Sequence, residues 1–112
     1  MKLQTFSKKQ KNLLNALTFI SKYKVSGHSM EPLIIDKASV LISRIPYWFK
    51  DPKINDIVAF RNSGKIFLKR IIKIQNGKYF VAGDNKNDSY DSRNFGDISK
   101  KQILGKVIYI LK

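Results

Sequence analysis

The chain has 112 residues, of which 43% are hydrophobic, so it can build the core of one domain and is too apolar for a disordered basic tail. Lys and Arg number 22 against 8 Asp and Glu, and the formal net charge of +14 is typical of proteins that meet phosphate groups or anionic lipid. The chain has no Cys and 1 His, which excludes disulfides and thiolate catalysis and argues against a transition-metal site. We therefore expect no metal ion and no cofactor.

The N-terminal segment, residues 7 to 24, has the pattern of a basic amphipathic helix. Apolar side chains recur at the spacing of one helical face, with lysines around them; this face comprises Leu13, Ala16, Leu17, Ile20 and Tyr23. A helix of this kind either packs its apolar face on the domain or lies on an anionic membrane surface. The pattern leaves both interpretations open.

The same segment does not resemble a membrane anchor. No stretch approaches the roughly 18 consecutive apolar residues of a spanning helix, and residues 21 to 24 match a signal-peptide cleavage site poorly. We expect no transmembrane anchor and no cleaved signal. The expected organisation is a helix over residues 1–24 followed by a core domain over residues 25–112.

From Val25 onward the hydrophobic period changes to two, which is typical of β-strands. Short β-branched runs occupy residues 39–43, 57–61, 65–74, 78–82 and 106–111. Asn76 and Gly77 lie between two of these runs and favour the primed turn of a β-hairpin. The predicted fold class is mostly β: a compact antiparallel domain with one N-terminal amphipathic helix.

A candidate nucleophile, Ser29, lies in a segment bounded by Gly27 and Pro32. A serine hydroxyl needs a base within hydrogen-bond reach, and the base is normally His. The one His, His28, is adjacent in sequence, where neighbouring side chains usually point apart, so a Ser-His-Asp triad is disfavoured. The alternative base is a lysine that burial keeps neutral.

Lys69 is the lysine in the most suitable setting. Alternation along residues 65–74 places it on one strand face with Phe67 and Ile71, apolar neighbours that could desolvate it. The opposite face carries Ile66, Leu68, Arg70, Ile72 and Ile74. Composition alone favours the competing interpretation, a lysine on the solvated face of a half-exposed strand.

A third polar segment runs from Gly83 to Gly96. Together with Asp97 it holds half of the 8 acidic residues, but the spacing is not that of an EF-hand calcium loop. It is either a surface loop whose Asp and Asn side chains cap their own turns, or a buried polar brace around an active site.

These segments, in this order, resemble the type I signal peptidase family, the serine-lysine endopeptidases. Gly27-x-Ser29-Met30-x-Pro32 resembles the nucleophile motif, Leu68-Lys69-Arg70 the lysine motif and Ile54 to Phe60 the motif that precedes it. Gly83-Asp84-Asn85 through Ser89-x-Asp91-Ser92-Arg93-x-x-Gly96 resembles the last motif, which is the most specific. The four motifs cover residues 25 to 107.

The resemblance implies a role for each matching residue. Ser29 would be the nucleophile and Lys69 the general base, with Ser89 orienting the lysine amine. Supporting positions would be Asp91, Arg93 and Arg70 as an ion-pair brace and Asp84 as a residue that holds the loop, with Met30 and Pro32 at the substrate. The Ser29 backbone N–H would stabilise the oxyanion. Some family members add a serine hydroxyl two residues earlier, where this chain has Gly27.

The implied function is a serine endopeptidase that cleaves a precursor after a small residue, with small side chains at the first and third positions before the cut. We expect the chain to depart from the larger family members in two ways: their usual anchor is not expected here, and the 12 residues between Arg70 and Gly83 are too few for their accessory β domain. This minimal form is similar to the maturation proteases of nickel superoxide dismutase. The self-cleaving repressors of the DNA-damage response resemble it less.

Tyr47, Trp48 and Phe49 form an aromatic cluster between two prolines, where we expect a partly exposed loop. The cluster is either a lid over the core or a wedge in a membrane interface. With the basic helix it could give a peripheral contact with anionic membrane, and the expected location is peripheral or cytoplasmic.

Two other functions stay open at this point. One is a small basic β domain that binds nucleic acid or anionic lipid, although the motifs do not favour nucleic acid. The other is an inactive family member that acts as an interaction protein.

Overall fold

The computed structural model describes residues 2–5 and 19–111, and it confirms a mostly antiparallel β fold. The described strands are β1 (Lys2–Thr5), β2 (Ile20–Ser26), β3 (Ser39–Ser43), β4 (Ile57–Asn62), β5 (Lys65–Gln75), β6 (Lys78–Ala82), β7 (Ile98–Ser99) and β8 (Ile103–Leu111). Short helical turns connect some of them: α2 (Pro46–Phe49), η1 (Lys86–Asp88), α3 (Ser92–Phe95) and η2 (Lys100–Gln102).

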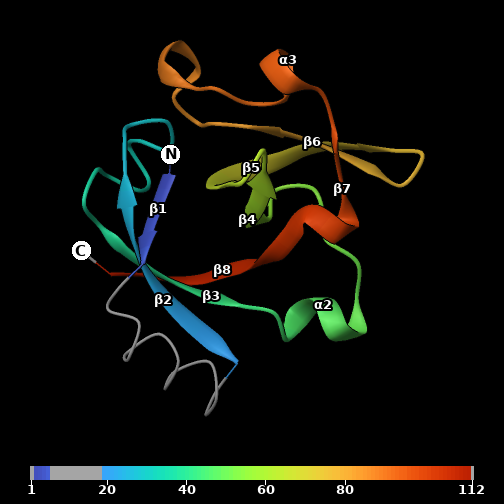
Figure 1. Cartoon of the computed structure of the whole chain (residues 1–112), viewed down its shortest axis with the longest axis horizontal. Helices are drawn as coiled ribbons and strands as arrows, with labels where there is room; N and C mark the ends of the chain where they lie inside the picture. Colours follow the sequence, from blue (N-terminus) through green and yellow to red (C-terminus); the bar gives the residue numbers. More distant parts are fainter. Residues whose placement is uncertain (1, 6–18, 112) are drawn as a thin grey trace.

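The strands form one sheet in the order β1-β2-β3-β8-β4-β5-β6-β7. Strand β1 also pairs with β5, at Lys2 and Phe67, and this pairing closes the first six strands of that order into a ring. The far half of β5 leaves the ring and pairs with β6, which carries β7 at the outer edge. Figure 1 shows β5 between the ring strands on one side and β6, β7 and α3 on the other.

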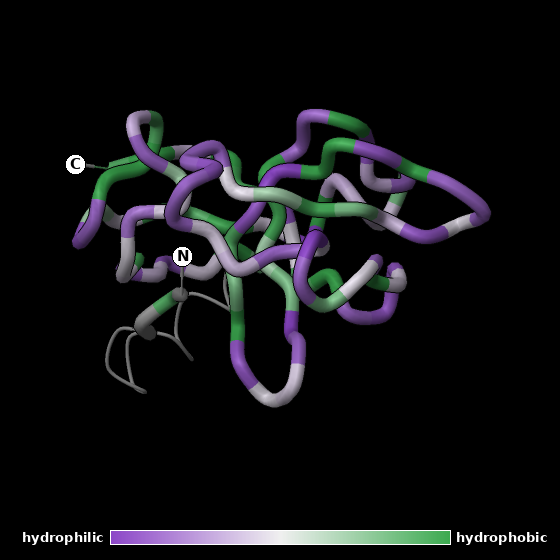
Figure 2. The backbone as a smooth tube through the Cα atoms, turned by 90° about the horizontal axis from the view of Figure 1, so that it is seen from above, coloured by the Kyte–Doolittle hydropathy of each residue, from purple (hydrophilic) through white to green (hydrophobic). Residues whose placement is uncertain are grey.

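Strand β5 is long enough, at 11 residues, to contribute to two hydrophobic clusters. Leu68 packs in the cluster inside the ring with Val25 and Met30, whereas Phe67 and Ile71 belong to the cluster beneath β6. Figure 2 shows hydrophobic segments through the middle of the molecule and hydrophilic ones at the loop ends. Both faces of β5 are therefore covered over residues 67 to 69.

The expected runs at 39–43 and 78–82 match β3 and β6. Asn76 and Gly77 form the tight turn between β5 and β6 with φ of 53° and 72°, both positive as a type I′ turn requires. The strict alternation expected along β5 ends at an irregularity in its pairing with β6 between Ile71 and Lys73. A bulge of this kind changes which side chains share a face.

The prediction of a helix over residues 7 to 24 is wrong at its C-terminal end. Residues 20 to 24 belong to strand β2, which pairs with β1 and β3. Tyr23 and Val25 are buried there while Lys24 is exposed, the alternation of a strand with one covered face. Residues 7 to 18 of the expected helix lie outside the described residues, so the proposed division at residue 24 stays a proposal.

The aromatic cluster expected in a loop forms the single helical turn α2. The side chains of Trp48 and Phe49 are exposed, while the Tyr47 hydroxyl donates a hydrogen bond of 2.8 Å to Asp56 Oδ2. In the part of the chain that the structure describes, no helix has the length and apolar character needed to cross a membrane.

Candidate active site

Ser29 lies in the turn segment that connects β2 with β3. The Ile34 N–H donates to the Met30 carbonyl oxygen at 2.9 Å, and the Gly27 N–H donates to Asp36 Oδ1 at 2.8 Å, which together hold the turn. Gly27 has a φ of 106°, a backbone conformation that disfavours any residue with a Cβ. Ser29 itself is 4% exposed, at the surface of the core.

Lys69 contacts Ser29 from strand β5. It stands on β5 opposite Val58 of β4, and its side chain is buried, with 1% exposed. Lys69 Nζ lies 2.8 Å from Ser29 Oγ and 3.1 Å from Ser89 Oγ. Composition favoured a lysine on a solvated strand face, but Lys69 is buried. Loops cover this face of β5 as well.

Burial lowers the pKa of Lys69, because removing an ammonium group from water disfavours its charged form. The negative charges of Asp91 and Asp88 act in the opposite direction without reversing the shift. Lys69 therefore gives up its proton more readily than a lysine in water.

Ser89 connects Lys69 to a buried carboxylate. Its hydroxyl donates to Asp91 Oδ2 at 2.7 Å, and Asp91 has no exposed surface. Burial by itself would raise the pKa of Asp91. Hydrogen bonds from Arg93, Ser89 and the Gly83 N–H outweigh it and hold the pKa well below its usual range. Asp91 is consequently an anion at any pH near neutrality.

The charged side chains near the site form two separate ion pairs rather than one three-residue brace. Arg93 binds Asp91 through Nε and Nη2 at 2.9 and 2.8 Å. Arg70 binds Asp84 through Nε and Nη2, both at 2.9 Å, and Arg70 Nη1 also donates to the Asn55 carbonyl oxygen. Each pair is bidentate, the geometry that fixes a guanidinium most firmly.

The loop after β6 is fastened directly to the Ser29 segment. The Asn85 N–H donates to the Ser29 carbonyl oxygen at 2.8 Å, and Asn85 Nδ2 donates to the His28 carbonyl oxygen at 3.1 Å. No role was expected for Asn85, although it belongs to the last of the four motifs. Asn85 thus ties the loop that carries Ser89 to the turn that carries Ser29.

Gly83 lies where these two segments come closest. A Cβ atom on Gly83 would overlap Ser89 Oγ and would lie 2.6 Å from the Ser29 carbonyl oxygen. Only a residue without a side chain fits at this position.

A cavity of about 340 Å³ opens beside Ser29 and Lys69. Its other lining residues are Ser26, Gly27, His28, Phe67, Asp88 and Tyr90. Neither of the residues expected at the substrate lines it: Met30 is fully buried in the core, and Pro32 is exposed outside the cavity. No role was expected for Asp88 and Tyr90, because only the fold brings them into the lining of this cavity.

His28, the neighbour of Ser29, is exposed and pairs with an acid. Its Nδ1 lies 2.8 Å from Glu31 Oε2, and this hydrogen bond raises the pKa of His28. Within residues 2–5 and 19–111, no group of three or more His, Asp or Glu side chains is arranged to hold a metal ion.

A buried lysine amine in contact with a serine hydroxyl, braced by a loop that closes on both, defines a serine-lysine site on a small β fold. The sequence profile of the family described as signal peptidase, peptidase S26, matches residues 12–75 and 73–111. The chain therefore belongs to this family of peptidases.

Comparison with individual relatives gives the same family. The chain is 25% identical to the probable signal peptidase I-2 of Synechocystis sp., over 80% of this chain and 62% of the relative. It is 24% identical to the thylakoidal processing peptidase 1, chloroplastic, of Arabidopsis thaliana, over 76% and 40%. It is 27% identical to the signal peptidase I of Bacillus amyloliquefaciens, over 74% and 71%. The chain thus spans less than two thirds of the first two relatives.

Proposed function

We propose that this chain is a serine endopeptidase in which Ser29 is the nucleophile and Lys69 the general base. The observation that carries the proposal is the 2.8 Å contact between Lys69 Nζ and Ser29 Oγ, with the lysine buried. Burial lowers the lysine pKa, and a base must be neutral to accept the serine proton.

The hydrogen bonds around Ser89 orient the amine of Lys69. Ser89 donates its proton to Asp91, which is an anion, so the Ser89 oxygen is an acceptor toward Lys69. A neutral Lys69 then donates one N–H to Ser89 and turns its lone pair toward the Ser29 hydroxyl. In this proposal Ser89 is a positioning residue, and Arg93 keeps Asp91 ionised.

Acylation follows from this arrangement. Lys69 takes the Ser29 proton as Oγ attacks the substrate carbonyl carbon, and the oxygen of the tetrahedral intermediate becomes negative. The Ser29 backbone N–H is the proposed donor to that oxygen, and Gly27 supplies no side-chain donor. The C–N bond then breaks, and the protonated Lys69 gives its proton to the leaving amine. The product of this step is an ester on Ser29.

Deacylation uses the same groups. Lys69 is neutral again, accepts a proton from a water molecule, and the resulting hydroxide attacks the ester carbonyl. Collapse of the second intermediate returns the proton from Lys69 to Ser29 Oγ and releases the acid product. Each group ends in its starting state.

The proposed substrate is a precursor with small residues at the first and third positions before the cut. The relatives are named as signal peptidases and a thylakoidal processing peptidase, which supports precursor segments as the substrate class. An extended segment could enter the cavity beside Ser29 between the Phe67 and Tyr90 side chains, which line it.

Paired variants test the proposal with a peptide that carries Ala at the first and third positions before the cut. Ser29→Ala and Lys69→Met should each lower kcat/KM by about 10³-fold or more. Ser39→Ala and Lys73→Met are matched controls, because Lys73 is an exposed lysine on the same strand. Unchanged cleavage in Ser29→Ala would rule the proposal out.

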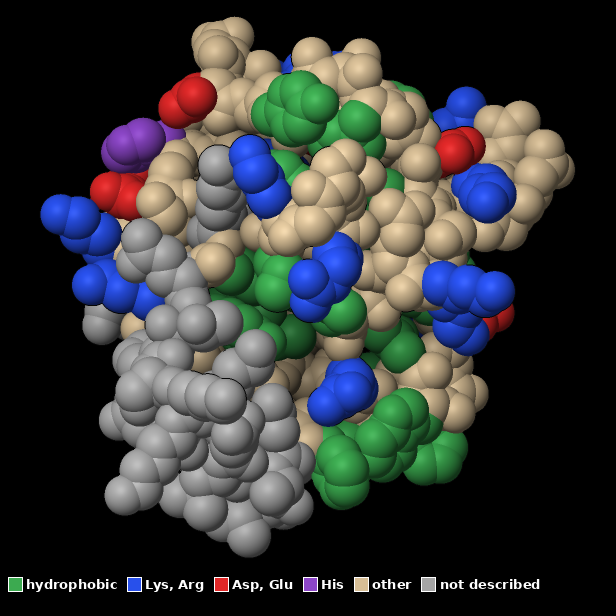
Figure 3. Space-filling view, in the orientation of Figure 1, with side chains coloured by type: hydrophobic (Ala, Val, Ile, Leu, Met, Phe, Trp, Pro, Cys, Tyr) green, Lys and Arg blue, Asp and Glu red, His purple; other side chains and the backbone are tan. Residues whose placement is uncertain are grey.

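We further propose a peripheral contact with anionic lipid through α2. Trp48 and Phe49 are 55% and 79% exposed, and the flanking Arg44, Lys50 and Lys53 are exposed cations. Figure 3 shows hydrophobic side chains at the lower right end of the molecule with Lys and Arg side chains near them. Exposed aromatic side chains flanked by cations suit the headgroup region of a bilayer.

A further inference from the structure

Most acidic side chains of this basic protein have a partner. The partnered carboxylates are Glu31 with His28, Asp36 with the Gly27 N–H, Asp51 with Lys100, Asp56 with Tyr47, Asp84 with Arg70 and Asp91 with Arg93. Asp88 and Asp97 have no hydrogen-bond or ion-pair partner among the described side chains.

Of these two, Asp88 lines the cavity that holds Ser29 and Lys69. The Asp88 N–H donates to the Asn85 carbonyl oxygen at 3.1 Å, which holds this part of the loop in place. Its negative charge raises the pKa of both Lys69 and His28, so it acts within the site. Asp88 is therefore an exposed carboxylate without a hydrogen-bond or ion-pair partner in the cavity where the proposed substrate enters.

The chemistry of the proposed reaction indicates which part of the substrate Asp88 meets. Asp88 precedes Ser89, whose hydroxyl contacts Lys69 Nζ at 3.1 Å. Lys69 must give its proton to the leaving amine, so the residues after the cut pass the lysine side of the nucleophile. Asp88 lines the same cavity as Lys69.

A cationic side chain also fits the wall beside Asp88. Tyr90 lines the same cavity, is 56% exposed, and lies with its ring 6.2 Å from that of Phe67. The aliphatic stem of a Lys or Arg can lie along this aromatic surface while its charge reaches a carboxylate.

We propose that Asp88 is a specificity-determining residue that favours substrates with Lys or Arg in the first residues after the cut. This inference rests on the proposed peptidase function and adds a second element to its substrate class. It runs against the overall charge of the protein, since a net charge of +14 attracts acidic peptides and repels basic ones. A preference for a basic substrate must then come from a local carboxylate.

The test uses a series of peptides with Ala at the first and third positions before the cut. In this series, Lys, Gln or Glu is placed in turn at each of the three positions after the cut. The native chain should cleave the best Lys peptide roughly three- to fivefold faster, as kcat/KM, than its Glu counterpart, the size expected for one partly solvated ion pair. Asp88→Asn should bring that ratio to about one or below, and Asp88→Lys should reverse it. Added salt should weaken the preference.

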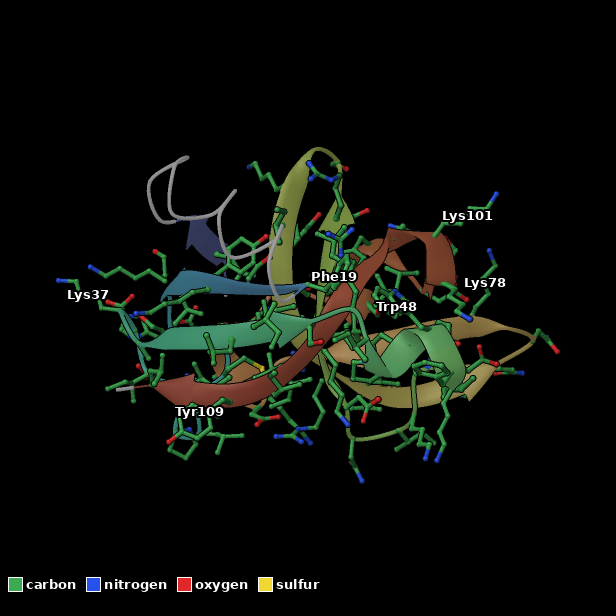
Figure 4. All side chains as sticks on the ribbon, turned by 90° about the horizontal axis from the view of Figure 1, so that it is seen from below. Phe19, Lys37, Trp48, Lys78, Lys101 and Tyr109 are labelled. Atoms are coloured by element: carbon green, nitrogen blue, oxygen red, sulfur yellow. The ribbon has the colours of Figure 1, made fainter. Side chains whose placement is uncertain are left out.

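Asp97→Asn is the matched control, because it removes the other unpaired carboxylate. Asp97 lines a separate cavity with Lys73 and Lys78, so the Lys-to-Glu ratio should stay at its native value. Figure 4 labels Lys78, which lies at the end of the molecule that carries the β5–β6 turn. An equal drop in both variants would overturn the inference, since it would mean that only net charge matters.

The outcomes separate the inference from the function on which it rests. Cleavage that depends on Ser29 but is equal for Lys and Glu peptides overturns the role of Asp88 and leaves the peptidase proposal standing. If the native chain cleaves none of the peptides, both proposals fail together.

Discussion

Lys69 Nζ and Ser29 Oγ are 2.8 Å apart although 40 positions separate the two residues in the chain. Strand β5 supplies the lysine and the β2–β3 turn supplies the serine, and the loop after β6 closes over both. The contact exists because three separate segments converge on one buried point.

The rate of cleavage should increase with pH. Lys69 acts only when neutral, and burial places its pKa below that of a lysine in water, so kcat/KM should rise as the amine loses its proton and then reach a plateau. A pH–rate profile with a neutral peptide measures this. A rate that is flat between about pH 6 and pH 9 would contradict the assignment of Lys69 as base.

Ser89→Ala should lower kcat by about 10²-fold with little change in KM, because Lys69 loses the acceptor that turns its lone pair toward Ser29. Ser89→Thr keeps a hydroxyl and should restore part of the rate. Steady-state kinetics on the native chain, Ser89→Ala and Ser89→Thr measure both effects.

Ser92→Ala is the companion to this variant. The buried Ser92 hydroxyl accepts a hydrogen bond from the Val81 N–H at 2.8 Å and does not contact Lys69. Its loss should reduce the free energy of unfolding by about 1–3 kcal/mol while kcat stays near the native value. Equal losses of kcat in Ser89→Ala and Ser92→Ala would mean that Ser89 has only a structural role.

Gly83→Ala should abolish most activity, because the new methyl group would overlap Ser89 and crowd the Ser29 carbonyl oxygen. Gly105→Ala introduces a similar clash, with Ile42 Cγ2 at 2.8 Å and Ser43 O at 2.9 Å, but in the core away from the site. Urea unfolding should show that both variants are destabilised. Only Gly83→Ala should lose kcat in conditions where both remain folded.

Asp91→Asn should destabilise the fold by about 2 kcal/mol near neutral pH, since hydrogen bonds to a charged group are lost. The pKa of Asp91 is lowered in the folded state, so its contribution is present above the unfolded pKa and is lost as pH falls through the folded one. The difference in unfolding free energy between the native chain and the variant should therefore shrink below about pH 4. A constant difference from pH 7 to pH 3 would count against this account.

Trp48→Ser and Phe49→Ser should each weaken binding to vesicles rich in phosphatidylserine by roughly three- to tenfold, because an apolar side chain no longer enters the interface. Tyr109→Ser is the control, since Tyr109 is 59% exposed but lies far from α2 (Figure 4). Figure 4 also shows Phe19 beside Trp48, and their ring centroids are 5.0 Å apart. Vesicle sedimentation with equal binding of all four proteins would exclude α2 as the contact.

Turn residues and β-branched runs in the sequence predicted the elements whose structure depends on nearby residues. The β5–β6 hairpin followed from Asn76 and Gly77, and β3 and β6 from β-branched runs. Strand β2 did not, because Ile20 and Tyr23 fit a helical spacing equally well, and only pairing with β1 and β3 selects the strand. Pairing with distant strands cannot be predicted from the sequence of the segment itself.

The candidate site shows the same division. Motif order placed Ser29, Lys69 and Ser89 in one family pattern, but alternation along β5 could not predict that Lys69 is buried. Its burial depends on loops from distant parts of the chain. The separation of the charged residues into an Arg70–Asp84 pair and an Arg93–Asp91 pair likewise needed the fold.

The most direct test of the central claim is to trap the acyl intermediate. The native chain is mixed with an ester of the small-residue peptide, quenched in acid within a single turnover, and its intact mass is measured. The account predicts a mass increase equal to the acyl group, located on Ser29 by fragmentation, and absent from Ser29→Ala and Lys69→Met. Turnover of the peptide with no adduct on Ser29, and at the same rate in Ser29→Ala, would contradict it.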